Sequence, residues 1–119
     1  MPSTRSRPPT EPLLDILHNI ELAVRFTRGM TYKEFCEDER TVYAVTRCLE
    51  IISEASRRLP KPLKVRHPAI PWTDIAAAGN VYRHSYEDVL ERILWQTLQH
   101  ALEPLKAVLA EELRRLEDR

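Results

Sequence analysis

Apolar residues recur at helical spacing in three long stretches of this chain, and no stretch shows the alternation of a β-strand. The first helix is predicted to begin at Thr10, which can cap it, and to stop at Gly29. Its apolar stripe consists of Leu13, Ile16, Leu17, Ile20, Ala23 and Val24. A capping-box pattern at Thr31 and Glu34 then predicts a short extra helix over residues 31–37.

Two more boundaries are set by capping residues and prolines. Asp38 can start a second long helix that Pro60 ends. The stripe of this helix is Val42, Val45, Cys48, Leu49, Ile52 and Ala55. Four prolines predict that residues 59–72 are a loop, after which Thr73 or Asp74 caps a third helix.

The final apolar stripe begins after the acidic pair Glu87 and Asp88, which favours a helix N-terminus. Pro104 should kink or split this last helix, because proline donates no backbone hydrogen bond. The sequence therefore predicts an all-α, antiparallel helical bundle of four long helices plus a short extra helix. The bundle should span residues 10–119, with residues 1–9 as a disordered N-terminal tail.

Composition narrows the classes of function. The chain has 119 residues, enough for one core, and its 18 basic residues equal its 18 acidic residues. A neutral chain lacks the overall positive charge of a dedicated nucleic-acid binder, so any such contact must come from a local patch. The two cysteines, Cys36 and Cys48, are not spaced as metal ligands, and we expect their thiols to be reduced. With no signal peptide and no apolar run of membrane-spanning length, we expect a cytoplasmic protein without membrane contact.

The polar chemistry gathers near residue 80. On a helix, Asn80, Arg83 and His84 project from one face, and Tyr86 follows just beyond. A guanidinium clamps phosphate and an imidazole moves protons near neutral pH, so this set suits a phosphodiester or a nucleotide. A solvated, slightly basic helix face explains the same pattern.

A second basic group lies in the proline-rich loop that precedes this helix. Lys61, Lys64 and Arg66 belong to a segment without acidic residues and are candidate RNA or phosphate contacts. A solvated connector whose charges aid solubility is the alternative. Gly79 is unexpected among alanines, and either close helix packing or an approaching ligand explains it.

No pattern for a bound group is present. The chain has no glycine-rich phosphate loop and no repeated Glu-x-x-His, so neither a cofactor nor a metal site is predicted.

Three segments together resemble one known family. Residues 13–20 read LLDILHNI, similar to an early L-x-x-I-L-x-x-I helix. Residues 47–55 read RCLEIISEA, similar to R-x-L-E-I-I-G-E-A, and residues 68–76 read PAIPWTDIA, similar to P-x-I-P-W-x-x-I-A. The chain resembles the HepT-like branch of the HEPN superfamily over nearly its whole length, which implies a HEPN-like helical bundle.

The resemblance also implies a site. The family stretch is R-N-x-x-x-H-x-Y, which Asn80, His84 and Tyr86 match, whereas Gly79 stands where the family has arginine. In active members the arginine and histidine act across a homodimer interface in metal-independent RNA cleavage. His84 is then the expected acid/base, Arg83 a substitute phosphate stabiliser, and Asn80 an orienting group.

A partner is implied as well. In HepT-like proteins the tyrosine of H-x-Y accepts AMP from a MntA-type nucleotidyltransferase, the antitoxin of the pair, and Tyr86 occupies that position. The leading hypothesis is a toxin–antitoxin endoribonuclease that AMP transfer neutralises. Alternatives are a non-catalytic nucleotide-binding or partner subunit with a degenerate site, and a purely structural helical dimer.

Overall fold

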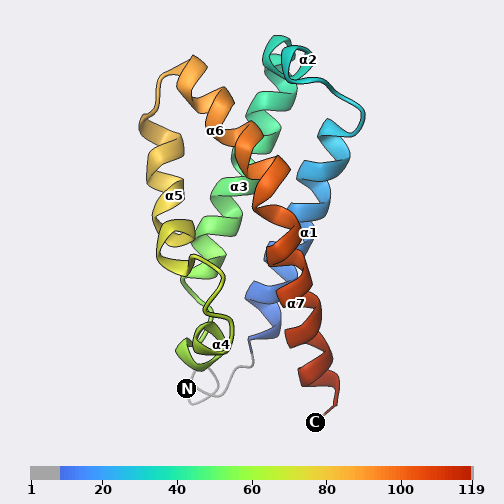
Figure 1. Ribbon diagram of the computed structural model, residues 1–119, viewed down its shortest axis with the longest axis vertical. Coiled ribbons are helices and arrows are strands. Elements are labelled where there is room, and N and C mark those ends of the chain that lie inside the picture. The colour runs from blue at the N-terminus through green and yellow to red at the C-terminus, as the bar shows by residue number, and fades with distance from the viewer. Residues whose placement is uncertain (1–8, 119) are drawn as a thin grey trace.

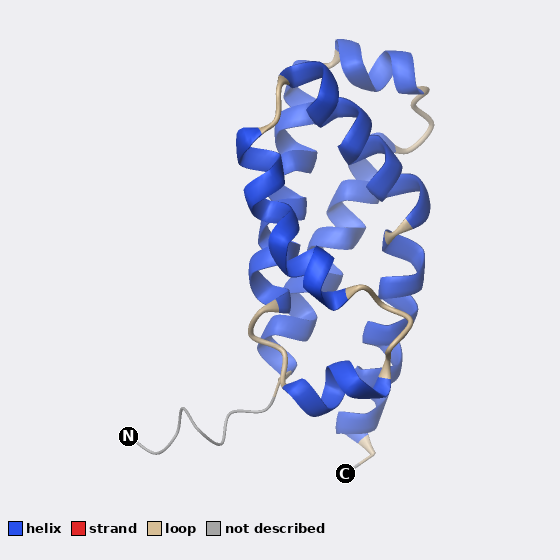
Figure 2. Ribbon diagram, turned by 60° about the vertical axis from the view of Figure 1, so that its left-hand side comes forward, coloured by secondary structure: helices blue, strands red, loops and turns tan. Residues whose placement is uncertain are grey.

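The computed structural model describes residues 9–118, and these form seven helices and no strand (Figures 1 and 2). In chain order the helices are α1 (Thr10–Thr27), α2 (Tyr32–Glu37), α3 (Glu39–Ser56), α4 (Lys61–Arg66), α5 (Trp72–His84), α6 (Glu87–His100) and α7 (Leu102–Glu117). The predicted tail lies outside the described residues except for Pro9, which is the N-cap of α1.

Four long arms run antiparallel along the 47 Å axis of the molecule (Figure 1). They are α1, α3, α5 and the consecutive pair α6 and α7, and α2 covers one end of the bundle (Figure 1). The all-α bundle predicted from the sequence is confirmed. Its apolar stripes meet in one core, with Leu13, Ile16, Ile20, Phe35, Val45, Leu94 and Leu109 almost fully buried.

Local capping chemistry accounts for several helix ends. The hydroxyl of Thr31 accepts from the N–H of Glu34, and the Glu34 carboxylate accepts from the N–H of Thr31, which completes the predicted capping box. Asp38 caps α3 through the N–H of Thr41. Gly29 follows α1 with a φ of 80°, a left-handed conformation that glycine adopts without strain.

Prolines shape the remaining boundaries, and here the sequence predictions were partly wrong. The last arm divides at Ala101, three residues before Pro104, as predicted. The segment 59–72, predicted as a loop, contains the short helix α4 because Pro62 fits a first helical turn and Leu63 is buried. Helix α5 begins after Pro71, not at a Thr73 or Asp74 cap.

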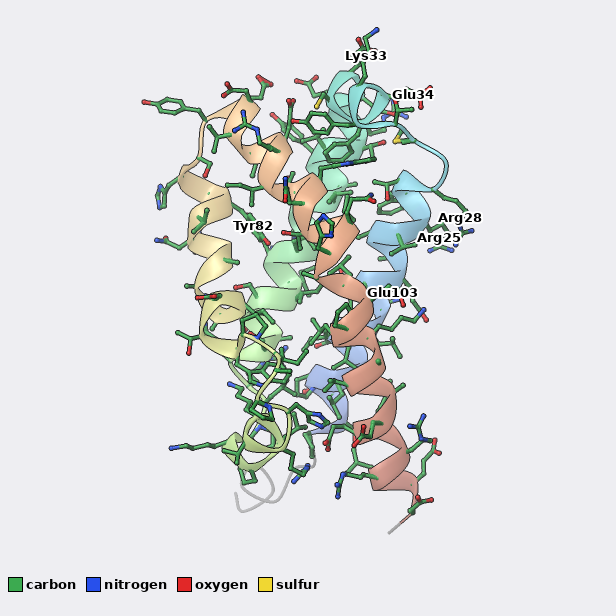
Figure 3. The ribbon with its side chains drawn as sticks, in the orientation of Figure 1. Arg25, Arg28, Lys33, Glu34, Tyr82 and Glu103 are labelled. Atoms are coloured by element: carbon green, nitrogen blue, oxygen red, sulfur yellow. The ribbon has the colours of Figure 1, made fainter. Side chains whose placement is uncertain are left out.

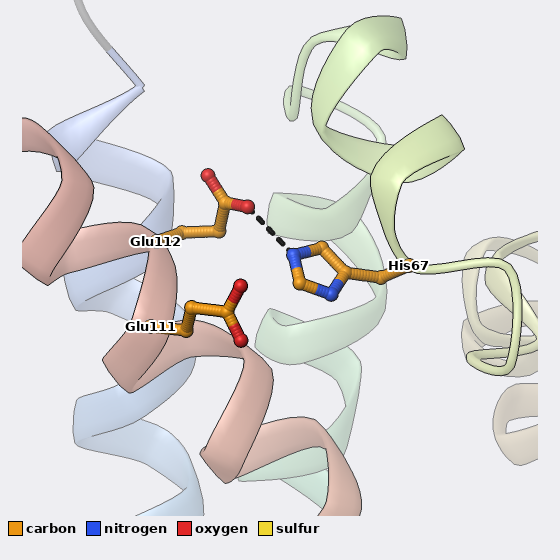
Figure 4. Close-up of side chains that lie close together, drawn as sticks. All are labelled: His67, Glu111 and Glu112. Carbon is orange, nitrogen blue, oxygen red and sulfur yellow. Dashed lines mark hydrogen bonds and ion pairs between the residues drawn. The ribbon is translucent and has the colours of Figure 1, made fainter.

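A buried carboxylate ties α4 and the segment after it to α7. Glu112 is 2% exposed, and both of its oxygens accept from Arg66, at 2.6 and 3.1 Å. The Nε2 atom of His67 lies 2.6 Å from the same carboxylate (Figure 4). Charge-assisted, bidentate pairing of this kind offsets the cost of burying a carboxylate.

Glu112→Gln should lower the free energy of unfolding at pH 7 by about 1 to 2 kcal/mol, because the charge-assisted hydrogen bonds are weakened. The Arg66 guanidinium holds the pKa of Glu112 below its ordinary 4.5. This stabilisation is therefore present above pH 4.5 and is lost as the pH falls through the lowered folded-state pKa.

Thermal unfolding of both proteins between pH 3 and 7 checks this expectation, with exposed Glu111→Gln as the matched control. A stability difference that stays constant across this range, or a control that behaves like Glu112→Gln, would contradict the assignment.

Candidate functional site

The candidate site lies at the C-terminal end of α5. Three consecutive alanines, residues 76–78, favour helix formation here. At the start of α5 the indole N–H of Trp72 donates to the carbonyl of His67, at 3.0 Å. The backbone becomes extended at Ser85, whose hydroxyl donates to the carbonyl of Val81, and Tyr86 is the N-cap of α6.

Asn80, Arg83 and His84 are all exposed, as three helical residues at this spacing on one outward face should be. Tyr86 is 84% exposed on the turn that follows. Within residues 9–118, no hydrogen bond or ion pair engages the Asn80, Arg83 or His84 side chain. These polar groups are therefore available to an external ligand.

The opposite side of α5 is apolar. Tyr82 is 7% exposed and points from α5 into the bundle, and burial raises its pKa (Figure 3). Beside it lies a cleft of about 200 Å³ lined mainly by apolar residues of α3, α5, α6 and α7, among them Leu49, Ile52, Leu102 and Leu105. Asn80, Arg83 and His84 do not line this cleft, so the polar candidate site is separate from it.

Gly79 is buried against α3, which decides between the two explanations that the sequence left open. Its N–H donates to the hydroxyl of Ser53, at 3.1 Å. The same hydroxyl donates to the carbonyl of Ala76, at 3.0 Å, and Arg57 donates to that carbonyl through Nε and Nη2, at 3.2 and 2.9 Å. Gly79 serves close helix packing.

The roles of Ser53 and Arg57 were not predicted from the sequence. A signal for the first was present, because Ser53 follows Ile52 and lies one turn after Leu49 within an apolar stripe. A hydroxyl on a buried face requires a partner, and here α5 provides both a donor and an acceptor. The partner lies more than 20 residues away along the chain, which sequence spacing does not reveal.

The basic candidates of the proline-rich segment do not join this site. Lys61, Lys64 and Arg66 belong to α4, at the end of the bundle where α5 begins, whereas His84 lies where α5 ends (Figure 1). A helix of 13 residues separates its ends by about 18 Å. These basic residues therefore lie about one helix length from the polar face, and Arg66 is moreover paired with Glu112.

One side-chain group has the composition of a metal site. Ligand atoms of His67, Glu111 and Glu112 lie within 4.8 Å of one another (Figure 4). Arg66 takes both oxygens of Glu112, and the Nε atom of Arg115 lies 3.7 Å from one of them. These positive charges favour an ion-pair network over cation binding. Within the described residues 9–118, no helix combines the length and hydropathy needed to cross a bilayer.

Comparisons with known proteins converge on one family. A family model described as "Ribonuclease HepT-like" matches residues 16–112. A "Probable ribonuclease HepT" from Thermococcus cleftensis is 42% identical over 79% of this chain and 86% of its own length. A "Putative RNase" from Methanocaldococcus jannaschii is 32% identical over 90% of this chain and 92% of its own. No solved structure matches the chain.

Proposed function

The chain belongs to the HepT-like ribonuclease family, and we propose that it is a metal-independent endoribonuclease, the toxin of a toxin–antitoxin pair. The observation that carries this proposal is the pairing of an exposed guanidinium, Arg83, with an exposed imidazole, His84, on one turn of α5. Both side chains lack a partner among residues 9–118. Cleavage of a phosphodiester needs two such groups, a positive charge that stabilises the phosphate and a side chain that transfers a proton.

In the proposed reaction, the 2′-hydroxyl of the RNA attacks the adjacent phosphorus and gives its proton to His84. Arg83 stabilises the negative charge that develops on the phosphate oxygens, and Asn80 orients the phosphate through its amide. The 5′-oxygen leaves with a proton from a second imidazole, which yields a 2′,3′-cyclic phosphate and a 5′-hydroxyl. Lys61 and Lys64 are proposed to contact phosphates further along the strand.

A homodimer would supply that second imidazole. The candidate residues Asn80, Arg83 and His84 are exposed, and one copy presents too few groups to enclose a phosphodiester. Val81 on α5 and Val89 on α6 are exposed apolar side chains on either side of the turn between these helices. Exposed apolar side chains here favour association of two copies with their polar faces close together.

The dimer is tested by light scattering at tens of micromolar, where a standard interface of about 800 Å² per partner should hold. Val81→Asp should shift the protein to a monomer, because it places a charge within the proposed interface. Val65→Asp is the matched control, since Val65 is 67% exposed on the distant helix α4. A monomeric native chain, or dissociation by the control alone, would refute this interface.

RNA cleavage should require the side chains of Arg83 and His84, and it should proceed in EDTA. His84→Ala and Arg83→Gln are each expected to lower kcat by about 100-fold or more, since each removes a group that acts in the transition state. Exposed Arg40→Gln, on α3, is the matched control. Gel analysis of a mixed-sequence RNA and end-group analysis for cyclic phosphate provide the measurements.

Cleavage that His84→Ala leaves unchanged would reject the mechanism. RNA or nucleotide binding without cleavage by the native chain would instead support the alternative, a non-catalytic partner subunit with a degenerate site.

We further propose that a MntA-type nucleotidyltransferase neutralises the site. The phenol oxygen of Tyr86 would attack the α-phosphorus of ATP, form a phosphodiester to AMP, lose its proton and release pyrophosphate. Exposure supports this choice of acceptor, because Tyr86 is 84% exposed whereas Tyr82 is 7% exposed. The added phosphate would carry negative charge next to Arg83 and compete with RNA.

Incubation with the cognate nucleotidyltransferase and ATP should add AMP to the peptide that follows Arg83, as peptide mass mapping would show. Tyr86→Phe should abolish the added mass while the helical circular-dichroism signal stays unchanged. Tyr43→Phe is the control, because Tyr43 is 71% exposed on α3. AMP on Tyr82, or equal labelling of Tyr86→Phe, would show that the acceptor is assigned wrongly.

A further inference from the structure

Ser53 and Gly79 form a close contact between α3 and α5 near the proposed site. The hydroxyl of Ser53 is fixed from two sides, because it donates to the carbonyl of Ala76 and accepts from the N–H of Gly79. Ser53 is 1% exposed. The hydroxyl therefore holds the backbone of α5 directly before the turn that carries Asn80, Arg83 and His84.

This contact leaves little room for a side chain at position 79. A Cβ atom there would lie 3.1 Å from Oγ and 3.5 Å from Cβ of Ser53. The first distance is shorter than ordinary carbon–oxygen contact, and the hydroxyl has little freedom to move because both of its hydrogen bonds would be strained. A side chain at position 79 therefore requires Ser53 to shift, which glycine avoids.

The guanidinium of Arg83 lies on the open side of the same glycine. Its Nη1 atom would be 3.7 Å from a Cβ at position 79, in ordinary contact. The side chain of Arg83 therefore runs back one turn along α5, in the direction that helical side chains lean. Positive charge beside residue 79 comes from Arg83, whereas Arg57 is bound to the Ala76 carbonyl.

We propose that Ser53 is a positioning residue that determines which helical position supplies the phosphate-binding guanidinium of the site. With serine at position 53, a side chain at position 79 would be tightly packed, and the guanidinium comes from Arg83. Ser53 and Gly79 touch each other. We infer that the two positions are coupled, and that Arg83 provides the positive charge that position 79 does not.

The role of Ser53 in placing the guanidinium depends on the proposed ribonuclease site, whereas the contact between Ser53 and Gly79 does not. Thermal unfolding tests the contact alone. Gly79→Ala should lower Tm by about 5 °C or more in the native background, because the added methyl group meets the Ser53 hydroxyl. In the Ser53→Gly background the same change should leave Tm equal or higher, since alanine favours helix.

The matched control is Ser56→Gly. Ser56 is also 1% exposed on α3, but its hydroxyl donates to the carbonyl of Ser53 within the same helix. Ser56→Gly should not relieve the effect of Gly79→Ala. Equal losses of Tm in the native, Ser53→Gly and Ser56→Gly backgrounds would refute the coupling, and Ser53→Ala provides a second background if Ser53→Gly is poorly folded.

Moving the arginine from position 83 to position 79 tests the role of Ser53 in placing the guanidinium. Arg83→Gln should weaken the binding of a fluorescent single-stranded RNA in EDTA about 10-fold and slow its cleavage about 100-fold. Gly79→Arg added to Arg83→Gln should restore neither property. The triple variant Ser53→Gly/Gly79→Arg/Arg83→Gln should recover binding to within about threefold and cleavage to within about 10-fold of the native chain.

The possible results separate the role of Ser53 from the ribonuclease proposal. Equal recovery with and without Ser53→Gly, or a folded triple variant that fails to recover, refutes the role of Ser53, and Ser53→Ala replaces Ser53→Gly if the triple variant is poorly folded. If the native chain binds RNA without cutting it, the ribonuclease proposal fails, yet recovery of binding in the triple variant still supports the relocation.

Discussion

The close approach of α5 to α3 is the constraint on which the candidate site depends. Among the other helices, α5 packs extensively against α3 alone, and the cleft beside Tyr82 separates it from much of α6 and α7. Hydrogen bonds from Ser53 and Arg57 to the Ala76 carbonyl fix this approach, and glycine at position 79 allows it. These contacts fix α5 through backbone groups, so the side chains of Asn80, Arg83 and His84 on its outward face are not used for packing.

The basic residues Arg66, His67, Arg83 and His84 differ in whether they lie next to a carboxylate. At one end of the bundle, Arg66 and His67 are bound to the buried Glu112 and hold α4 to α7. At the other end, Arg83 and His84 have no partner within residues 9–118 and face solvent. Of these four residues, the two that pair with the buried Glu112 stabilise the fold, whereas Arg83 and His84 stay exposed.

Much of the fold could be read from the sequence, because it rests on short-range signals such as helical stripes, the Thr31 capping box and the break near Pro104. Contacts between distant segments could not. Glu112 falls on the apolar face of α7, yet its partner Arg66 lies 46 residues away. Likewise, the spacing of Asn80, Arg83 and His84 predicted a shared face, but whether Gly79 served packing or a ligand was undecided until α3 was placed beside it.

Glycine at position 79 does not leave its part of α5 without positive charge. The effect of a guanidinium on a phosphate depends on where its nitrogens lie, and long helical side chains reach back a full turn towards the N-terminus. Arg83 starts four residues after Gly79 and still places a nitrogen beside it. The residue at position 79 therefore has to be interpreted together with its packing, and here a buried serine and a returning arginine both lie beside it.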